Sequence, residues 1–171
     1  MFFKSMKGLV YPIHDKQIVV TDIFKRVGLK KPVVGKLALE KYYIDDGNTP
    51  EDIAKIFYNN VYYHWVILVV NDIVNVYEEW PKPEAALLDY VRDKYGADIE
   101  SIEIYDHHYA LAEDTSIIVD YDAAKIASGE YVAISNYQYE LQLNENKRQI
   151  SILRPEYLKE FVTQHTKLMA I

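Results

Sequence analysis

The stretch that decides the fold is YYIDDGNTPEDIAKIF, residues 42–57. Its opening, Tyr42 to Ile44, favours a β-strand, because aromatic and β-branched side chains suit a pleated, half-buried surface. Asp46-Gly47-Asn48 is typical of a turn. Thr49 can cap a helix, and Pro50 suits its first position, where the N–H that proline lacks would have no partner. The stretch therefore predicts a strand, a turn and a helix in succession.

A second helix is expected after the first. The first helix carries one apolar stripe, made of Ile53, Ala54, Ile56 and Phe57. Asn59-Asn60 ends it, and residues 62–71 follow, apolar nearly all round. Their periodicity is compatible with a buried helix and with a buried strand. Because the break before them is short, we expect a helical hairpin.

Breakers and periodicity predict the rest of the chain. Pro83 and Gly96 frame a helix over residues 83–95. Residues 98–135 alternate short β-like runs with turns, which predicts a small antiparallel insertion of hairpins. The predicted elements at the end of the chain are a helix over 137–147, a strand over 149–153 and a helix that Pro155 opens.

The first 36 residues show little periodicity. Glycines and prolines interrupt them, residues 17–20 could form a short strand, and residues 21–24 could open a helical turn. The basic residues of this region cluster at Lys25, Arg26, Lys30, Lys31 and Lys36. We expect an extended arm, and an arm that cannot bury its own apolar residues usually lies on a partner protein.

Composition excludes several classes of function. The 171 residues carry a net charge of −7, which argues against sequence-independent binding to nucleic acid or to an anionic membrane. The chain has no cysteine, so disulfides, thiol chemistry and zinc–thiolate sites are excluded. The longest apolar run, Trp65 to Val70, is far short of the ~20 residues that span a bilayer. Nothing at the N-terminus resembles a signal peptide, so we expect a soluble protein that is made in a reducing cytoplasm.

Tyrosine dominates the aromatic residues, with 16 tyrosines against 5 phenylalanines and 2 tryptophans. Tyrosine suits surfaces that become buried only in a complex, but it also fills half-buried positions of small folds. We favour the interpretation that many of these tyrosines lie at an interface with other proteins. The candidate partner-binding residues are Phe24, Tyr42, Tyr58, Tyr62, Tyr63, Trp80 and Arg148. Trp80, before Pro81, is the candidate for an exposed anchor, and Arg148 either pairs with an acidic partner or ends a solvated helix.

The deciding stretch resembles the LysM family. Gly47-Asn48-Thr49, Ile53-Ala54, Leu68 and Asn71 stand at the places where LysM domains have a Gly-Asp-Thr-like turn, Ile-Ala in the first helix, a leucine in the second and a closing asparagine. The resemblance implies a β-α-α-β core. The fold class is accordingly α+β, and its expected segments are an N-terminal arm (1–37), the LysM-like core (38–80), a helix with a β-rich insertion (81–136) and a C-terminal helical and strand segment (137–171).

A narrower resemblance involves the baseplate wedge protein "53" family of T-even-like contractile phages. It rests on residues 42–54, on Tyr63 to Asp72 and on the block from Glu140 to Ile152, with residues 21–24 in the same order upstream. The resemblance implies a virion structural protein without catalysis or cofactor, located in the tail baseplate. Its partners would be other wedge proteins and a sheath-initiator-like protein in a six-fold assembly, where it would hold neighbouring wedges together.

LysM domains often bind peptidoglycan or chitin, which is the alternative function. The groove would involve Gly47, Asn48 and Thr49, with Tyr77 near enough to stack on a sugar. In the simpler interpretation, which we favour, the turn merely starts the helix, and a single module binds a glycan weakly.

Enzymatic and metal sites have little support in the sequence. Asp106-His107-His108 and Asp120-Tyr121-Asp122 invite a metal interpretation, but adjacent histidines in a strand point to opposite faces, so a solvated turn is expected and no metal is predicted. Neither a phosphate-binding glycine loop nor a Gly-x-Ser-x-Gly elbow occurs. The paired carboxylates lie at predicted element ends, so we expect no enzyme.

Overall fold

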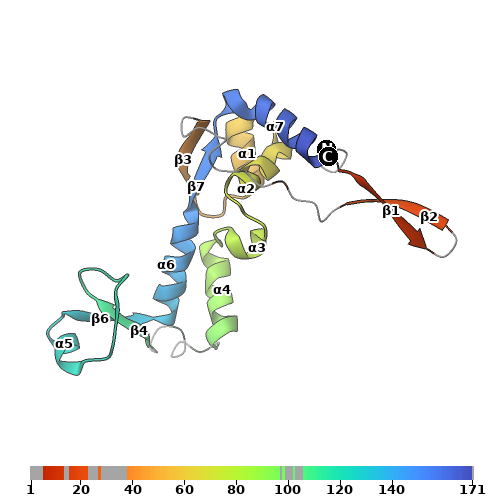
Figure 1. The fold of residues 1–171 in the computed structure, drawn as a ribbon. Helices are drawn as coiled ribbons and strands as arrows, with labels where there is room; N and C mark the ends of the chain where they lie inside the picture. The colour runs from red at the N-terminus through yellow and green to blue at the C-terminus, as the bar shows by residue number, and fades with distance from the viewer. Residues whose placement is uncertain are drawn as a thin grey trace. The chain divides into compact units, whose positions relative to one another are not determined.

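The computed structural model describes residues 6–13, 16–22, 27, 38–96, 98, 102 and 106–170. They form a mixed α+β fold, as expected (Figure 1). The chain divides into two compact units. Unit 1 comprises Met1–Tyr43, Asn48–Glu79 and Ile150–Ile171, and unit 2 comprises Ile44–Gly47 and Trp80–Gln149. Among the described residues, no helix combines the length and the apolar character that crossing a membrane requires.

Unit 1 contains the predicted strand–turn–helix. Strand β3 spans Leu39–Tyr43, and helix α1 spans Pro50–Tyr58. Thr49 caps α1 in a reciprocal arrangement: its hydroxyl accepts from the Asp52 N–H, and the Asp52 carboxylate accepts from the Thr49 N–H. Such a pair satisfies two donors that a helix start otherwise leaves free. The predicted helix start is therefore confirmed at the residue expected.

The second predicted helix is also confirmed. A short 3₁₀ turn, η3 (Val61–Tyr63), leads directly into α2 (His64–Val70), and the small helix α3 (Val76–Glu79) follows. Val66, Ile67 and Val70 are buried on α2. Trp65, Leu68 and Val69 are half-buried, so most of α2 is shielded from solvent, in agreement with its apolar sequence.

The strand beside β3 comes from the far end of the chain. It is β7 (Gln149–Leu153), which pairs with β3 in a two-stranded sheet (Figure 1). The Ile44 N–H donates to the Arg148 carbonyl, and the Arg154 N–H donates to the Ala38 carbonyl, so the strands run antiparallel. Unit 1 thus has the order β-α-α-β, but the second strand follows about 80 residues after α2 rather than before residue 80. The local pattern around residues 72–80 could not reveal this, because a strand's partner is chosen by non-local pairing.

The core of unit 1 joins these elements to the final helix. Ala38, Val66, Val70 and Leu153 form a buried cluster. Helix α7 (Pro155–Ala170) packs Leu158, Phe161 and Val162 against it. The helix predicted after Pro155 is therefore confirmed, and it belongs to the same compact unit as residues 48–79.

The N-terminal region forms a two-stranded antiparallel hairpin where an arm with a single short strand was expected. Strands β1 (Gly8–Ile13) and β2 (Lys16–Thr21) pair from Gly8 with Thr21 to Ile13 with Lys16. The predicted helical turn at residues 21–24 lies mostly outside the described residues.

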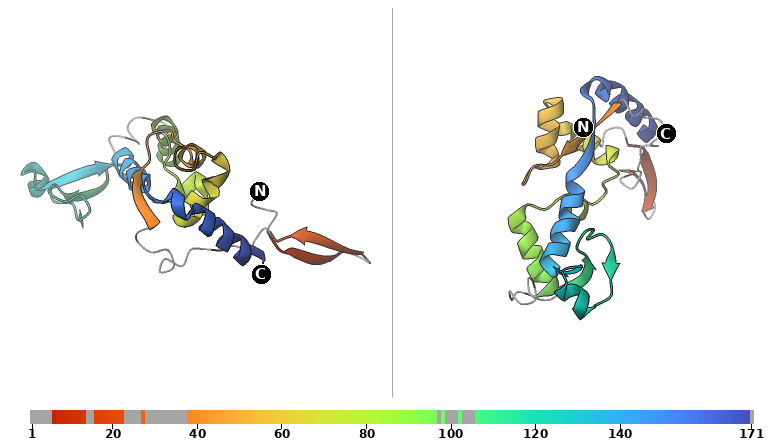
Figure 2. Two further views of the ribbon diagram at one scale, coloured as in Figure 1. Left: turned by 90° about the horizontal axis from the view of Figure 1, so that it is seen from above. Right: turned by 90° about the vertical axis from the view of Figure 1, so that its left-hand side faces the viewer.

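Unit 2 is built on two helices that lie side by side, α4 (Glu84–Tyr95) and α6 (Asn136–Arg148), drawn in green and light blue in Figure 2. Leu87 and Val91 of α4 pack with Ile102, and Tyr137 and Leu141 of α6 cover them. Both helices were predicted, with boundaries within a residue or two.

The predicted β-rich insertion lies between these two helices. Its sheet has the order β5-β4-β6, from β4 (Asp106–Leu111), β5 (Ile118–Val119) and β6 (Tyr131–Ser135). A short helix that the sequence pattern did not predict, α5 (Ala123–Ala127), connects β5 to β6, and Asp122 caps it.

Candidate partner-binding surfaces

The β1–β2 hairpin is the most exposed apolar part of the described chain. Every residue of both strands is exposed to solvent. Its large apolar residues, called the hairpin surface below, are Leu9, Val10, Tyr11, Ile13, Ile18, Val19 and Val20. An isolated two-stranded hairpin is only marginally stable in water. Burial of these apolar residues would therefore stabilise the hairpin.

The register divides the hairpin surface into two unequal faces. Cross-strand partners share a face, so the pairs Leu9–Val20 and Tyr11–Ile18 lie on one side together with Ile13. Val10 and Val19 pair on the other side, whose remaining pairs contain glycine, proline and polar residues. We call the first side the aliphatic–tyrosine face and the second the valine face. The valine face is nonetheless open, since Val19 is 70% exposed.

None of the seven predicted partner-binding residues belongs to the hairpin. The sequence nonetheless contains a pattern that is compatible with a β-hairpin. Residues 9–13 form one apolar run, and Ile18-Val19-Val20 form a second after His14-Asp15 and two polar residues. Phe24, the only candidate from the N-terminal region, lies outside the described residues.

Three of the candidate tyrosines pack inside unit 1. Tyr42 meets Phe57 edge to face, with ring centroids 5.1 Å apart, and Tyr58 meets Tyr63 in the same way at 6.1 Å. The Tyr58 hydroxyl donates to the Leu153 carbonyl at 2.9 Å, and burial raises the pKa of this phenol, so it stays protonated. These half-buried rings hold β3, α1, η3 and β7 together.

Tyr62 is the candidate tyrosine that projects into solvent, with 77% of its surface exposed. It lies in η3, and Val61 beside it and Ile56 of α1 are exposed too. These residues add a second, smaller group of exposed apolar side chains to unit 1.

Trp80 does not form the exposed anchor that was expected. It is buried, as is the following Pro81. The prediction treated the Trp-Pro step as a loop boundary. The indole is buried in its own unit instead, because burying a large aromatic ring is more favourable than exposing it to water.

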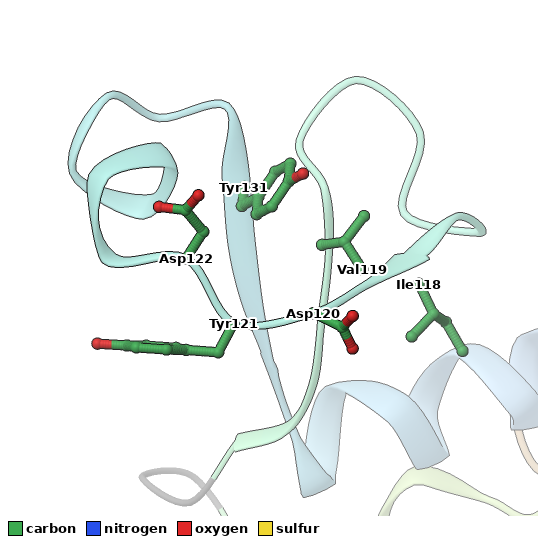
Figure 3. A pocket seen from close by; sticks show the side chains of 6 residues that line it. All are labelled: Ile118, Val119, Asp120, Tyr121, Asp122 and Tyr131. Atoms are coloured by element: carbon green, nitrogen blue, oxygen red, sulfur yellow. The ribbon is translucent and has the colours of Figure 1, made fainter.

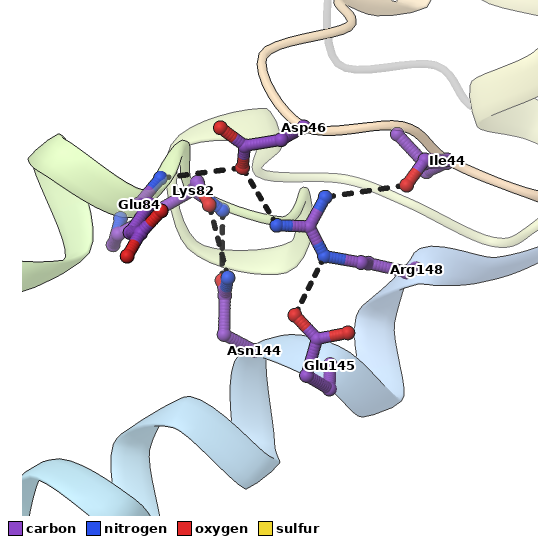
Figure 4. A network of polar contacts seen from close by, with 7 residues as sticks. All are labelled: Ile44, Asp46, Lys82, Glu84, Asn144, Glu145 and Arg148. Atoms are coloured by element: carbon purple, nitrogen blue, oxygen red, sulfur yellow. Dashed lines mark hydrogen bonds and ion pairs between the residues drawn. The ribbon is translucent and has the colours of Figure 1, made fainter.

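Arg148 is also held inside its own unit (Figure 4). Its guanidinium donates to the Asp46 carboxylate at 2.7 Å, to the Glu145 carboxylate at 2.8 Å and to the Ile44 carbonyl at 3.2 Å. Burial opposes its charge, but the hydrogen bonds to the two carboxylates outweigh it and raise the pKa of Arg148. Neither predicted role, an ion pair with a partner or a solvated helix end, describes this buried side chain, because the carboxylates beside it belong to its own chain.

The same network fixes the start of α4. The Asn144 side chain accepts from the Lys82 N–H at 2.8 Å and donates to the Lys82 carbonyl at 2.9 Å (Figure 4). Asp46 additionally accepts from the Glu84 N–H, at the first residue of the helix. A buried amide that satisfies both backbone groups of one residue acts as a clamp on that segment.

Some of the residues predicted to line the alternative glycan groove already have a structural role. The Thr49 hydroxyl is the cap of α1, and Gly47 adopts a left-handed conformation with φ of 77°. Tyr77, on α3, is almost fully exposed. Gly47 belongs to unit 2, whereas Asn48, Thr49 and Tyr77 belong to unit 1.

The adjacent histidines meet instead of pointing apart. Their Nδ1 atoms lie 2.9 Å apart, because the strand is irregular between Asp106 and His108. His107 stacks on Tyr139 with ring centroids 3.8 Å apart. In the described part of the chain, no three His, Asp or Glu side chains come close enough together to hold a metal ion.

Comparison with known proteins adds evidence on the class of protein. Residues 6–123, more than half of the chain, match the family described as base plate wedge protein 53. The chain belongs to this family. A similar protein is the baseplate wedge protein gp53 of Enterobacteria phage T4, which is 26% identical over 167 residues, covering 89% of this chain and 85% of the relative.

Membership of the wedge protein 53 family confirms the resemblance seen in residues 42–72. It makes the protein a structural part of a phage baseplate and places it in the virion tail. The family match includes the hairpin surface and ends within the β-rich insertion. Baseplate components work by assembly with other proteins, so exposed apolar surfaces are the features of this chain to interpret as functional.

Proposed function

We propose that this protein joins neighbouring wedges of the baseplate by binding adjacent wedge proteins and a sheath-initiator-like protein. The observation that carries the proposal is the hairpin surface: a two-stranded element with seven large apolar residues, all exposed in the isolated chain. Large apolar patches on soluble proteins mark interaction sites. In this proposal the hairpin becomes buried on a neighbouring subunit during assembly.

Two further observations support a bridging role. The chain consists of two compact units, and each has exposed apolar residues of its own. Unit 1 exposes the hairpin surface and the Tyr62 region, whereas unit 2 exposes Ile118 and Tyr121 in its insertion. A protein with separate binding surfaces can hold two neighbours at once, and a closed ring then multiplies weak contacts through effective concentration.

The experiment is complementation of a phage that lacks this gene with variants of the hairpin. The double substitution Leu9→Ser/Ile18→Ser removes two residues from the aliphatic–tyrosine face, and Val10→Thr/Val19→Thr is the matched change on the valine face. We expect the first variant to lower incorporation into tails at least tenfold and the second to lower it less. Both should leave the unfolding midpoint of the isolated protein nearly unchanged, because exposed substitutions rarely shift stability by more than about 0.5 kcal/mol.

Equal incorporation of both variants at the wild-type level would contradict the proposal. Loss of incorporation together with a large loss of stability would place the hairpin in the fold of the protein rather than at an interface. Circular dichroism of each purified variant distinguishes these results.

The glycan-binding alternative rests on the exposed Tyr77 ring. Aromatic rings in shallow grooves stack on sugars, and a bound glycan would require this one. Retention of the wild-type protein on peptidoglycan, lost in Tyr77→Ala, would support the alternative. We expect no retention in either case, since the Thr49 side chain already serves α1.

A further inference from the structure

The β-rich insertion of unit 2 presents an open sheet edge. In the sheet order β5-β4-β6, β5 is a terminal strand. Its two residues pair with Tyr109 and Ala110 of β4 on one side, and the described residues supply no strand on the other side. An uncovered edge strand offers unpaired backbone groups to another extended chain.

Apolar side chains flank this edge. Ile118 is 68% exposed and Tyr121 is 66% exposed, and Ile117 is exposed as well. Figure 3 shows Tyr121 extending away from the ribbon of the sheet. The ring of Tyr109 supports it from one side at 5.2 Å. This ring contact restricts the rotamers of the exposed tyrosine, which lowers the entropy lost when a partner packs on it.

The insertion is acidic throughout. Residues 106–135 contain six carboxylates and one basic side chain, and these are Asp106, Glu113, Asp114, Asp120, Asp122, Glu130 and Lys125. The Lys125 ammonium lies 3.3 Å from the Glu130 carboxylate and donates to the Tyr131 hydroxyl, so its charge is already engaged. Asp120 lies in the open pocket beside β5 and makes no hydrogen bond or ion pair with the described residues (Figure 3).

We name Glu113, Ile117, Ile118, Asp120 and Tyr121 the acidic edge. Its chemistry fits a partner segment that is basic and aliphatic. Residues 23–37 of the chain have this composition, with five basic residues, no acidic one, and Ile23, Leu29, Val33, Val34 and Leu37. Most of these residues lie outside the described part of the structure.

We propose that the acidic edge binds residues 23–37 of a second copy of this chain. Within one copy the segment starts from unit 1, since His165 of α7 hydrogen-bonds the backbone of Val27 and Ala38 belongs to the unit 1 core. Unit 1 of one copy would then bind unit 2 of the next, a head-to-tail contact that forms a ring when the rotation closes. The inference rests on the proposed function, because it names the copy in the adjacent wedge as one of the partners.

The test is sedimentation of the isolated full-length chain at low and high salt. We expect self-association at 50 mM NaCl that weakens about tenfold at 500 mM, because the contact pairs opposite charges at the surface. The edge variant Glu113→Lys/Asp120→Lys and the segment variant Lys30→Glu/Lys31→Glu should each remain monomeric. A mixture of the two should associate again, because the reversed edge of one variant is complementary to the reversed segment of the other and their unchanged surfaces still match.

A matched control, Asp93→Lys/Glu156→Lys, changes the net charge by the same amount at exposed helical positions outside the acidic edge. It should associate like the wild type, and circular dichroism should show that all variants are folded. A chain that stays monomeric at every concentration, or an edge variant that associates like the control, would overturn the inference. Dimers formed by the edge variant alone would also overturn the inference. Incorporation into tails is measured separately, so failure here leaves the test of the proposed function intact.

Discussion

At the scale of single residues, buried polar side chains hold the units in shape. Arg148, Asn144 and Glu140 are all buried in unit 2, and each makes hydrogen bonds within that unit. The sequence showed a basic helix end at Lys147-Arg148 but could not show its burial. Burial depends on Asp46 and Ile44, which lie about a hundred positions away in the sequence.

Replacing Arg148 should therefore affect folding and not only recognition. We expect Arg148→Met to lower the free energy of unfolding by about 2 kcal/mol, because it removes hydrogen bonds to two carboxylates and leaves the Ile44 carbonyl with one donor fewer. Urea unfolding followed by circular dichroism measures this. Arg92→Met is the control, because Arg92 forms only an exposed pair with Asp89 at 3.6 Å and should cost less than about 0.5 kcal/mol. Equal losses in the two variants would contradict the internal role of Arg148.

His165 gives the stability of the protein a pH dependence. It packs against Trp65 with ring centroids 4.7 Å apart, and burial lowers its pKa below the usual value, although a hydrogen bond to the Val27 backbone works in the opposite direction. As pH falls through about 6.5, the unfolded chain binds a proton that the folded state resists, so stability decreases. Above that pH the residue is neutral in both states and has no such effect.

We expect His165→Gln to reduce the loss of stability between pH 7.5 and pH 5.5. The measurement is the difference in urea midpoint between these two pH values for each protein. Because all other groups are shared, the difference between the two proteins reports His165. The same pH dependence in both proteins would show that this histidine titrates alike in the folded and unfolded states.

At the scale of elements, the sequence predicted what local chemistry determines. Thr49, Pro50 and Asp52 placed the start of α1 correctly, and the proline and glycine around residues 83–96 placed α4. The pairing of β3 with β7 was missed, because no local pattern links residues 39–43 to 149–153. The resemblance implied a β-α-α-β core, and the β-α-α-β order of unit 1 is reached only across the inserted unit 2.

Asn71 joins the second helix to that distant strand. Its side chain donates to the Ser151 carbonyl at 2.8 Å and to the Ile67 carbonyl at 2.9 Å, and its Oδ1 accepts from the Ser151 N–H at 2.8 Å. The sequence singled out this residue as the closing asparagine of the LysM pattern. Its contacts give a physical reason for an asparagine here, since only a primary amide offers a donor and an acceptor in that geometry.

We expect Asn71→Ala to lower the free energy of unfolding by about 2–3 kcal/mol, because the Ser151 backbone groups would lose their partners in a half-buried place. Asn71→Asp should also destabilise, since a carboxylate cannot donate to the Ser151 carbonyl. Asn146→Ala, at an exposed position of α6, is the control and should be neutral or slightly stabilising. Stability of Asn71→Ala within about 0.5 kcal/mol of the wild type would refute the role assigned to this amide.

At the scale of the whole molecule, the function lies in surfaces that the isolated chain leaves open. The sequence indicated an interface protein through its tyrosines, but most of the candidate rings that are described serve internal packing, and the largest open surface is the mainly aliphatic hairpin. Side-chain type alone could not separate the two uses, because a half-buried tyrosine and an interface tyrosine have the same chemistry. The family resemblance, carried by residues 42–72, predicted the baseplate role that composition could not.

The most direct measurement uses the absence of cysteine in this chain. Ile18→Cys places a single thiol on the aliphatic–tyrosine face of the hairpin, and Asp89→Cys places one on the exposed side of α4 as a reference. Maleimide labelling of this protein's band is compared between the isolated protein and purified tails. The proposed function predicts rapid labelling of both positions in the isolated protein and at least tenfold slower labelling of Ile18→Cys in tails, relative to Asp89→Cys. Equal labelling of Ile18→Cys in both states, in tails that contain the protein, would contradict the claim that the hairpin is buried on a neighbouring subunit.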